Sequence, residues 1–258
     1  MTRLSSLPVA LAEAIRGRRL LKVIAGLANF DAVSVTKVAR AAAAGGADLV
    51  DVACDPALVQ AVAAAAPGLP ICVSAVEPEL FPAAVAAGAS VVEIGNYDSF
   101  YPEGRLFTAA EVLELTRCTR ALLPAVVLSV TVPHTLPLDQ QEQLAIDLAA
   151  AGADLIQTEG GTSARPFSAG SLGLIEKAAP TLAAAHGISR ALQAADAPLP
   201  VLCASGLSAV TVPMALAAGA SGVGVGSAIN RLEDELAMVA VVRSLRESIS
   251  CAVLLPVA

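Results

Sequence analysis

One pattern occurs four times along the chain and constrains its fold more than any other feature. Each copy has Ala-Gly-Ala, or a close variant, followed at once by a short run of strand-forming residues. The copies are GGADLVDVA from Gly45, AGASVVEIG from Ala87, AGADLIQTEG from Ala151 and AGASGVGVGS from Ala218. A glycine in this place is typical of a helix end that turns tightly into a buried strand. The repeat therefore predicts alternating helices and parallel strands.

Four further strand-like runs lack this glycine entry and complete a set of eight predicted strands. These strands are expected at 20–26, 48–53, 70–75, 91–95, 126–131, 154–159, 200–205 and 222–226. Eight units in 258 residues favour closure over an open sheet, because a barrel of this kind typically takes about 250 residues. We predict an α/β fold, a single (β/α)8 TIM barrel domain over 1–258, with its core at about 20–248.

Two helix signals refine this prediction. Residues 8–19 are expected to form an extra N-terminal helix, packed under the first strand. Thr108, with Glu111 three residues on, has the pattern of a capping box and predicts a helix start.

The composition leaves two classes of protein to distinguish. The chain is 56% apolar and 15% charged, and residues 197–230 carry no charge, which raises a membrane protein as one alternative. Prolines and glycines divide that stretch into pieces too short to span a bilayer, so we predict no integral membrane segment. The first residues have no apolar signal-peptide core, and five cysteines without a CxxC pair fit a reducing compartment; both favour a cytoplasmic location. A net charge of −7 argues against nucleic acid as a partner.

Polar residues in the predicted strands share one parity, with apolar residues at the alternate positions. Because helices cover the outside of such a barrel, the polar set is expected to face inward. The residues expected to face inward are Lys22, Asp51, Cys72, Ser74, Glu93, Ser129, Thr131, Gln157, Glu159, Cys203 and Ser205. A purely structural barrel is filled mainly by branched apolar residues, so this polarity indicates a functional site.

Five of the ionisable residues are candidate catalytic groups. They are Lys22, Asp51, Glu93, Glu159 and His134, of which His134 follows the fifth strand in the string TVPHT. One lysine facing three carboxylates is expected to shift their pKa values apart, which is how acids and bases arise. A structural ion-pair network is the alternative, and Lys22 fits either an imine-forming nucleophile or a counter-ion to Asp51. No metal site is predicted, although the cluster could also hold a metal or a cationic group.

Glycine-rich loops after three strands predict a phosphate site. Such loops let the backbone approach an anion, and a helix N-terminus behind them offers free N–H groups. In TIM barrels phosphate commonly lies between the loops after strands 7 and 8. The predicted contacts are Ser205, Gly206, Leu207, Gly226 and Ser227, with Gly160, Gly161 and Thr162 in a third loop that also carries Arg165. The alternative is that these glycines only make tight turns.

Two weaker signals lie near the same end of the predicted barrel. The segment 96–101, which holds nearly half of the aromatic residues, is a candidate lid over the site. Asp31, after the first strand, could reach the site or could cap the following helix.

Several strings together resemble a known family. KVIAGLANFD, LPICVSAVEP, EIGNYDSFYPEGR, LSVTVPH, IQTEGGTS, CASGLS and GVGVGSAIN are similar to the uncharacterised hypothetical chloroplast reading frame family of plastids and photosynthetic bacteria, from about Leu20 to Leu245. The resemblance implies a ribulose-phosphate-binding-type barrel and, for relatives, a location in the plastid stroma. It implies no reaction.

A more distant similarity concerns the region after strand 7, which resembles that of thiazole synthase and pyridoxal-phosphate synthase barrels. The reactive lysine of those enzymes matches no motif here. FMN-dependent barrels also use this phosphate site, so FMN is a candidate cofactor; the cofactor itself is not predicted.

Three functions are consistent with these observations. The leading hypothesis is an enzyme of isomerase, lyase or condensation type that acts on a small phosphorylated metabolite. The second is a non-catalytic barrel that binds a phosphorylated metabolite or FMN and serves a protein partner. The third is a peripheral subunit of a membrane complex, suggested by the apolar tail at 253–257. A homo-oligomer is compatible with all three.

Overall fold

A computed structural model describes residues 3–160 and 165–254, with side chains described as far as Ala252. The strands are β1 (Leu20–Gly26), β2 (Leu49–Ala53), β3 (Ile71–Ala75), β4 (Val91–Ile94), β5 (Val127–Thr131), β6 (Leu155–Gln157), β7 (Val201–Ala204) and β8 (Gly222–Val225). The α-helices are α1 (Val9–Arg16), α2 (Ala32–Gly45), α3 (Pro56–Ala65), α4 (Phe81–Ala86), α5 (Ala109–Leu122), α6 (Leu138–Ala150), α7 (Gly170–Ala194), α8 (Val212–Ala217), α9 (Ser227–Asn230) and α10 (Glu235–Leu254). The 3-10 helices are η1 (Arg3–Ser6), η2 (Pro78–Leu80), η3 (Tyr97–Ser99) and η4 (Tyr101–Glu103).

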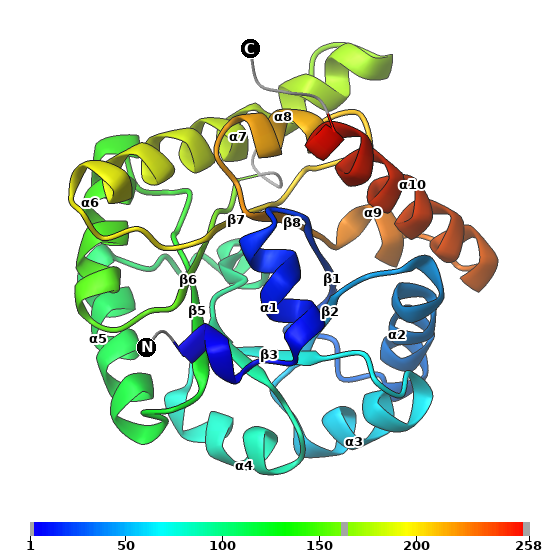
Figure 1. Cartoon of the computed structure of the whole chain (residues 1–258), viewed down its shortest axis with the longest axis horizontal. Helices are drawn as coiled ribbons and strands as arrows, with labels where there is room; N and C mark the ends of the chain where they lie inside the picture. The colour runs from blue at the N-terminus through cyan, green and yellow to red at the C-terminus, as the bar shows by residue number, and fades with distance from the viewer. Residues whose placement is uncertain (1–2, 161–164, 255–258) are drawn as a thin grey trace.

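The described strands β1 to β8 close into a barrel, and each is parallel to both of its neighbours. Helices surround the strands as an outer ring (Figure 1). The predicted (β/α)8 fold is therefore confirmed. The glycines of the four-fold repeat end their helices as expected, with φ angles from 86° at Gly46 to 120° at Gly88. The capping box at Thr108 and Glu111 is also present at the start of α5.

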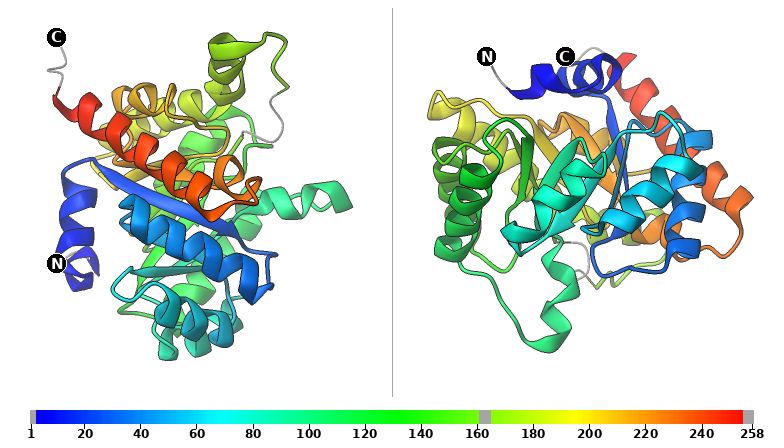
Figure 2. Two further views of the ribbon diagram at one scale, coloured as in Figure 1. Left: turned by 90° about the vertical axis from the view of Figure 1, so that its right-hand side faces the viewer. Right: turned by 90° about the horizontal axis from the view of Figure 1, so that it is seen from below.

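The N-terminal helix closes one end of the barrel. Leu7, Leu11 and Ile15 pack against the first inward-facing residues of the strands, among them Leu20 and Leu49, in a core separate from the one beneath the outer helices. Figure 1 shows α1 lying across the middle of the ring. Figure 2 shows that the segment with η3 and η4 projects from the opposite end. Only that opposite end, where the strands finish, remains available for a site.

Within the described residues, no helix combines the length and the apolar sequence needed to cross a membrane.

Close contact between β8 and β1 completes the barrel and depends on Gly222. A Cβ atom at this position would lie 2.4 Å from the backbone oxygen of Leu20 and 2.9 Å from its Cα. We expect Gly222→Ala to lower the free energy of unfolding by about 1–3 kcal/mol, because backbone cannot yield as a flexible side chain can. Urea unfolding would measure this loss. Gly68→Ala adds a Cβ in open space but at a φ of 85°, so its loss reports backbone strain alone, whereas the φ of Gly222 lies outside the left-handed region. A loss below about 1 kcal/mol in Gly222→Ala would contradict the steric argument.

Candidate active site

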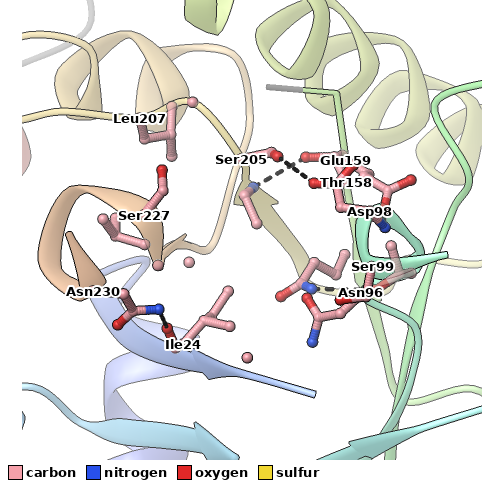
Figure 3. Close-up of a pocket in the computed structure, with 18 of the residues that line it drawn as sticks. Ile24, Asn96, Asp98, Ser99, Thr158, Glu159, Ser205, Leu207, Ser227 and Asn230 are labelled. Carbon is pink, nitrogen blue, oxygen red and sulfur yellow. Dashed lines mark hydrogen bonds between the residues drawn. The ribbon is translucent and has the colours of Figure 1, made fainter. Parts of the chain in front are cut away.

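A cavity of about 760 Å³ opens at the carboxyl ends of the strands. Its walls come from the ends of β1 and β5 to β8, together with the segment that follows β4 (Figure 3). Active sites of TIM-barrel enzymes lie at this end of the barrel, because the loops after the strands converge there.

The predicted phosphate loops form one wall of this cavity. Ser205, Gly206 and Leu207 follow β7, and Gly226 and Ser227 follow β8. Within the described residues, the backbone N–H groups of Gly206 and Leu207 donate no hydrogen bond, although Leu207 is only 5% exposed. Gly206 is half-buried, and an amide without a protein acceptor can donate to a ligand, so this wall is suited to an anion.

A helix follows each of these loops, as predicted. The helix after β7 begins only at Val212, and α9 after β8 is a single turn of four residues. Gly206 and Leu207 therefore lie in a loop that continues to Thr211, before the first turn of α8. Donors on this wall are loop amides.

The third predicted phosphate loop is only partly within the described residues. Gly160, with a φ of 145°, does not line the cavity, and a Cβ there would lie 3.1 Å from Pro180. Gly161 and Thr162 lie outside the described residues. Arg165, at the end of this loop, does line the cavity.

Two further cations line the cavity and were missed by the sequence analysis. Lys177 comes from the first third of the long helix α7, and Arg231 directly follows α9. The position of Arg231 next to the string GVGVGSAIN was a usable signal. Lys177 carried none, because it lies 20 residues beyond the end of β6. With Arg165 they supply three positive charges to one cavity.

Ser205 has a strained backbone at the point where the phosphate wall meets the opposite wall. Its φ is 81°, in the left-handed region that residues other than glycine rarely adopt. Its Oγ donates a hydrogen bond to Asp98 Oδ2 at 3.3 Å. Because such strain tends to be retained at functional sites, it marks this corner of the cavity.

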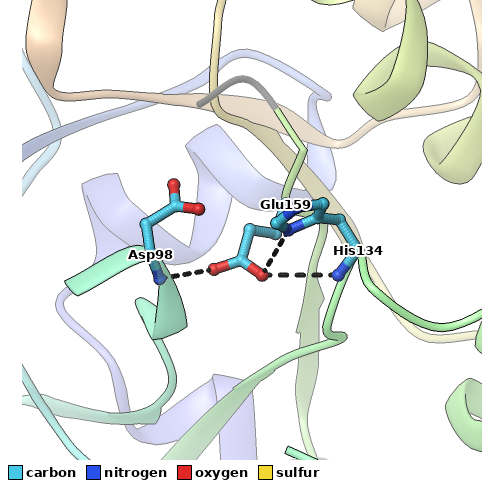
Figure 4. Close-up of side chains that lie close together, drawn as sticks. All are labelled: Asp98, His134 and Glu159. Carbon is cyan, nitrogen blue, oxygen red and sulfur yellow. Dashed lines mark hydrogen bonds and ion pairs between the residues drawn. The ribbon is translucent and has the colours of Figure 1, made fainter. Parts of the chain in front are cut away.

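The opposite wall carries Glu159, whose two oxygens are held by Tyr101 and by Asp98 and His134; Figure 4 shows the last two. Glu159 Oε2 lies 3.0 Å from the Nδ1 of His134 and accepts a hydrogen bond from the Tyr101 hydroxyl at 2.6 Å. Glu159 Oε1 accepts from the backbone N–H of Asp98 at 3.1 Å. This arrangement makes Nδ1 of His134 the donor and fixes the orientation of its ring, as carboxylates do for catalytic histidines.

The pKa of His134 is raised from its ordinary value. Burial acts to lower it, but the hydrogen bond to Glu159 and the negative charges of Glu159 and Asp98 together outweigh that effect. Burial and Glu159 also raise the pKa of Tyr101, so its hydroxyl stays protonated as a donor. His134 therefore keeps its proton to a higher pH than an ordinary histidine, while the hydroxyl of Tyr101 stays protonated at neutral pH.

Asp98, His134 and Glu159 are also the described residues best placed to hold a metal ion, because one ligand atom of each lies within 4.8 Å of the others. The two oxygens of Glu159 already accept four hydrogen bonds, from the backbone N–H groups of Asp98 and His134, the Tyr101 hydroxyl and the ring of His134. A metal would have to displace them, so the arrangement suits proton transfer better than metal binding.

The other predicted catalytic residues meet in a network deeper in the barrel. Lys22 Nζ lies 2.7 Å from Glu93 Oε2 and 3.5 Å from Asp51 Oδ2. The register of β3, β4 and β5 places Ser74 and Ser129 on either side of Glu93. The hydroxyl of Ser74 donates a hydrogen bond to Asp51 at 2.6 Å, and that of Ser129 donates one to Glu93 at 2.7 Å. Lys22, Asp51 and Glu93 are at most 1% exposed.

None of these three charged residues lines the cavity. Asn96 and Gln157 line it instead, and both donate hydrogen bonds to Glu93 or Asp51 beneath them. Burial acts to lower the pKa of Lys22, but Asp51 and Glu93 raise it by more, so the amine stays protonated. Of the two alternatives for Lys22, the geometry favours the counter-ion over the imine-forming nucleophile.

The parity prediction holds for six strands and fails in β7. Cys203 belongs to the core beneath the outer helices, and its thiol lies 3.6 Å from the Thr181 hydroxyl on α7. Leu202 faces inward instead, in the core beneath α1. Ser205 still lines the cavity because the chain turns at its positive φ, which breaks the alternation.

The two weaker sequence signals have different outcomes. The segment 96–101 contributes Asn96, Asp98 and Ser99 to the cavity wall. Asp31 caps α2 by accepting a hydrogen bond from the backbone N–H of Val33, which was the structural alternative.

Comparison with known proteins shows the same fold and a defined set of relatives. Thiamine phosphate pyrophosphorylase from Pyrococcus furiosus has a similar structure (TM-score 0.58, 17% identity, covering 92% of this chain and 98% of that one). So do 3-hexulose-6-phosphate synthase (TM-score 0.60, 18% identity, 89% and 99%) and (S)-3-O-geranylgeranylglyceryl phosphate synthase from Thermoplasma acidophilum (TM-score 0.59, 15% identity, 94% and 99%). At these identities the likeness shows the fold alone.

Sequence relatives are much closer. The uncharacterized protein ycf23 of Cyanophora paradoxa is 42% identical over 225 residues, covering 87% of this chain and 90% of that protein. Those of Porphyra purpurea and Pyropia yezoensis are 38% and 35% identical, covering 89% and 90% of this chain and 84% and 83% of theirs. These matches confirm the resemblance seen in the sequence motifs. Because the model of the family described as "Protein of unknown function (DUF561)" matches residues 6–254, the chain belongs to that family.

Proposed function

We propose that this protein is an enzyme that binds a small phosphorylated metabolite and moves a proton on it, in a reaction of isomerase, lyase or condensation type. One observation carries the proposal: a single cavity is lined by the loops after β7 and β8, by three cations and by Glu159, whose carboxylate is hydrogen-bonded to His134. An anion on those loops would hold its ligand beside this acid-base pair.

The phosphate end rests on the loops after β7 and β8. The amides of Gly206 and Leu207 supply donors, and Lys177 and Arg231 supply charge. Hydrogen bonds between charged groups and phosphate oxygens are stronger than neutral ones. Three of the structural neighbours carry a phosphate compound in their names, and one of them was solved with sn-glycerol-1-phosphate, which supports a phosphate in this fold.

The reacting end rests on Glu159, which lines the cavity, and on His134, which does not line it but is hydrogen-bonded to Glu159. With Nδ1 donating to Glu159, the opposite ring nitrogen, Nε2, is the atom that can take a proton in the neutral form. Glu159 stabilises the imidazolium that forms. Lys22, Asp51 and Glu93 act in this proposal as positioning residues, because Glu93 holds Gln157 at the cavity floor.

A second candidate function is a non-catalytic barrel that binds a phosphorylated metabolite or FMN. The observation that favours it is the separation of Lys22, Asp51 and Glu93 from the cavity, which removes most of the predicted catalytic groups from contact with a ligand. Three properties stay predictions in either case: a single domain, a cytoplasmic or stromal location, and self-association.

Binding of anions tests the phosphate wall directly. We expect Lys177→Met and Arg231→Met each to weaken binding of ribose 5-phosphate by about tenfold, the effect of one charged hydrogen bond. Isothermal titration calorimetry at fixed salt measures this change. Lys37→Met is the matched control, because Lys37 lies on α2 outside the cavity wall and donates to the Glu233 backbone.

The result that contradicts the proposal is also defined. If inorganic phosphate, ribose 5-phosphate and FMN all fail to bind, the wall is not an anion site. If FMN alone binds, the second candidate function replaces the first.

A further inference from the structure

Gln157, the last residue of β6, lies on the floor of the cavity with one polar atom unused. Its side chain is 1% exposed and lines the cavity from the barrel interior. Within the described residues, Gln157 Oε1 has no hydrogen-bond partner, whereas Nε2 has two. A buried acceptor left without a donor costs stability, so a retained one calls for a functional explanation.

The orientation of this amide is determined by the charged network beneath it. Nε2 donates to Glu93 Oε1 at 2.7 Å and to Thr131 Oγ1 at 3.2 Å. Rotating the amide by 180° would bring Oε1 against a carboxylate oxygen, which is repulsive. Glu93 is itself held through its other oxygen by Lys22 at 2.7 Å. The network therefore directs the oxygen of Gln157 away from Glu93.

Space beside this oxygen is kept by Gly224 on β8. A Cβ atom there would lie 3.4 Å from Gln157 Oε1 and 3.0 Å from the Cβ of Ala204. The cavity lining also includes neutral hydrogen-bonding side chains, among them Asn96, Thr131 and Asn230. Such a lining is complementary to several hydroxyl groups.

We propose that Gln157 is a specificity-determining residue that accepts a hydrogen bond from a hydroxyl group of the ligand. The ligand class is then a phosphorylated polyol or sugar, with phosphate on the loops after β7 and β8 and a hydroxyl on the barrel axis. This inference rests on the proposed function, because it assumes that the phosphate is bound in the same cavity.

The test compares two phosphates of equal carbon number, ribitol 5-phosphate and pentyl phosphate, with inorganic phosphate as the probe of the anion wall. We expect the unaltered protein to bind ribitol 5-phosphate at least about tenfold more tightly than pentyl phosphate, because a site built to bond a hydroxyl rejects an analogue that lacks it. In Gln157→Leu this preference falls to about twofold or less, whereas affinity for inorganic phosphate is retained.

A second variant guards against misfolding of the first. Gly224→Ala places a methyl group beside Oε1 and leaves the bond from Nε2 to Glu93 intact. It should reduce the preference for ribitol 5-phosphate as Gln157→Leu does, with unchanged circular dichroism. Isothermal titration calorimetry on all three proteins provides the measurement.

The outcomes separate this inference from the proposed function. An equal preference for ribitol 5-phosphate in the unaltered protein and in both variants would overturn the role of Gln157 while leaving the phosphate site in place. Failure of all three phosphates to bind the unaltered protein would overturn both.

Discussion

Lys22→Met is expected to lower the free energy of unfolding by about 3–5 kcal/mol, because removing one partner leaves buried charge uncompensated. Lys22 is the cation that holds Asp51 and Glu93 together, at 3.5 and 2.7 Å, where all three side chains are at most 1% exposed. Its pKa is raised, since burial acts to lower it but the two carboxylates raise it by more. Urea unfolding, with the slope of the transition compared between variants, measures the loss.

Two controls show whether the loss comes from charge. Lys37→Met replaces a lysine whose Nζ bonds only a backbone oxygen at the surface, and it should change stability by no more than about 0.5 kcal/mol. The double variant with Lys22→Met and Glu93→Gln removes charge from both partners, so its loss should be smaller than the sum of the two single losses. A loss below about 1 kcal/mol for Lys22→Met would show that the network contributes little.

His134→Gln is expected to reduce proton exchange on a bound sugar phosphate by about 10²–10⁴-fold, the usual contribution of a general acid-base group. Incorporation of deuterium next to the carbonyl of ribulose 5-phosphate or dihydroxyacetone phosphate, followed by proton NMR, measures the rate. Binding of inorganic phosphate should be unchanged, because His134 is not among the residues of the phosphate wall.

The pH dependence of this exchange distinguishes a base from a merely structural histidine. His134 accepts a proton only when neutral, and its pKa is raised above 6.5: burial opposes the shift, but Glu159 and Asp98 outweigh it. The rate should therefore rise with pH through a midpoint above 6.5. In Glu159→Gln the hydrogen-bonded charge is lost, so the midpoint should move to lower pH.

Two results would contradict the catalytic role of His134. If exchange in His134→Gln equals that of the unaltered protein, another group carries the proton. If the unaltered protein binds these sugar phosphates but exchanges no hydrogen on any of them, the non-catalytic barrel becomes the better description.

Local sequence was enough to predict the fold and the end of the barrel that carries the site. A glycine that ends a helix before a strand can be recognised within about ten residues of sequence. Four copies of this pattern, among eight predicted strands, leave few alternatives to a barrel. Alternation placed Lys22, Asp51 and Glu93 inside, because side-chain parity is a property of each strand by itself. The loops at Gly206 and Gly226 were likewise placed on the cavity wall correctly.

Tertiary structure alone decided which inward residues reach the ligand cavity. The depth of a side chain along the barrel axis depends on strand tilt and register. Glu93, Ser129 and Gln157 all face inward, yet Glu93 pairs with Ser129 and lies beneath Gln157. Lys177 reaches the cavity from a helix whose path cannot be predicted from the strand pattern. The turn at Ser205 brings that residue to the cavity wall, although Cys203 in β7 faces the outer helices. These features follow from how eight strands are staggered around one axis, which is a relation between distant segments rather than a property of any one of them.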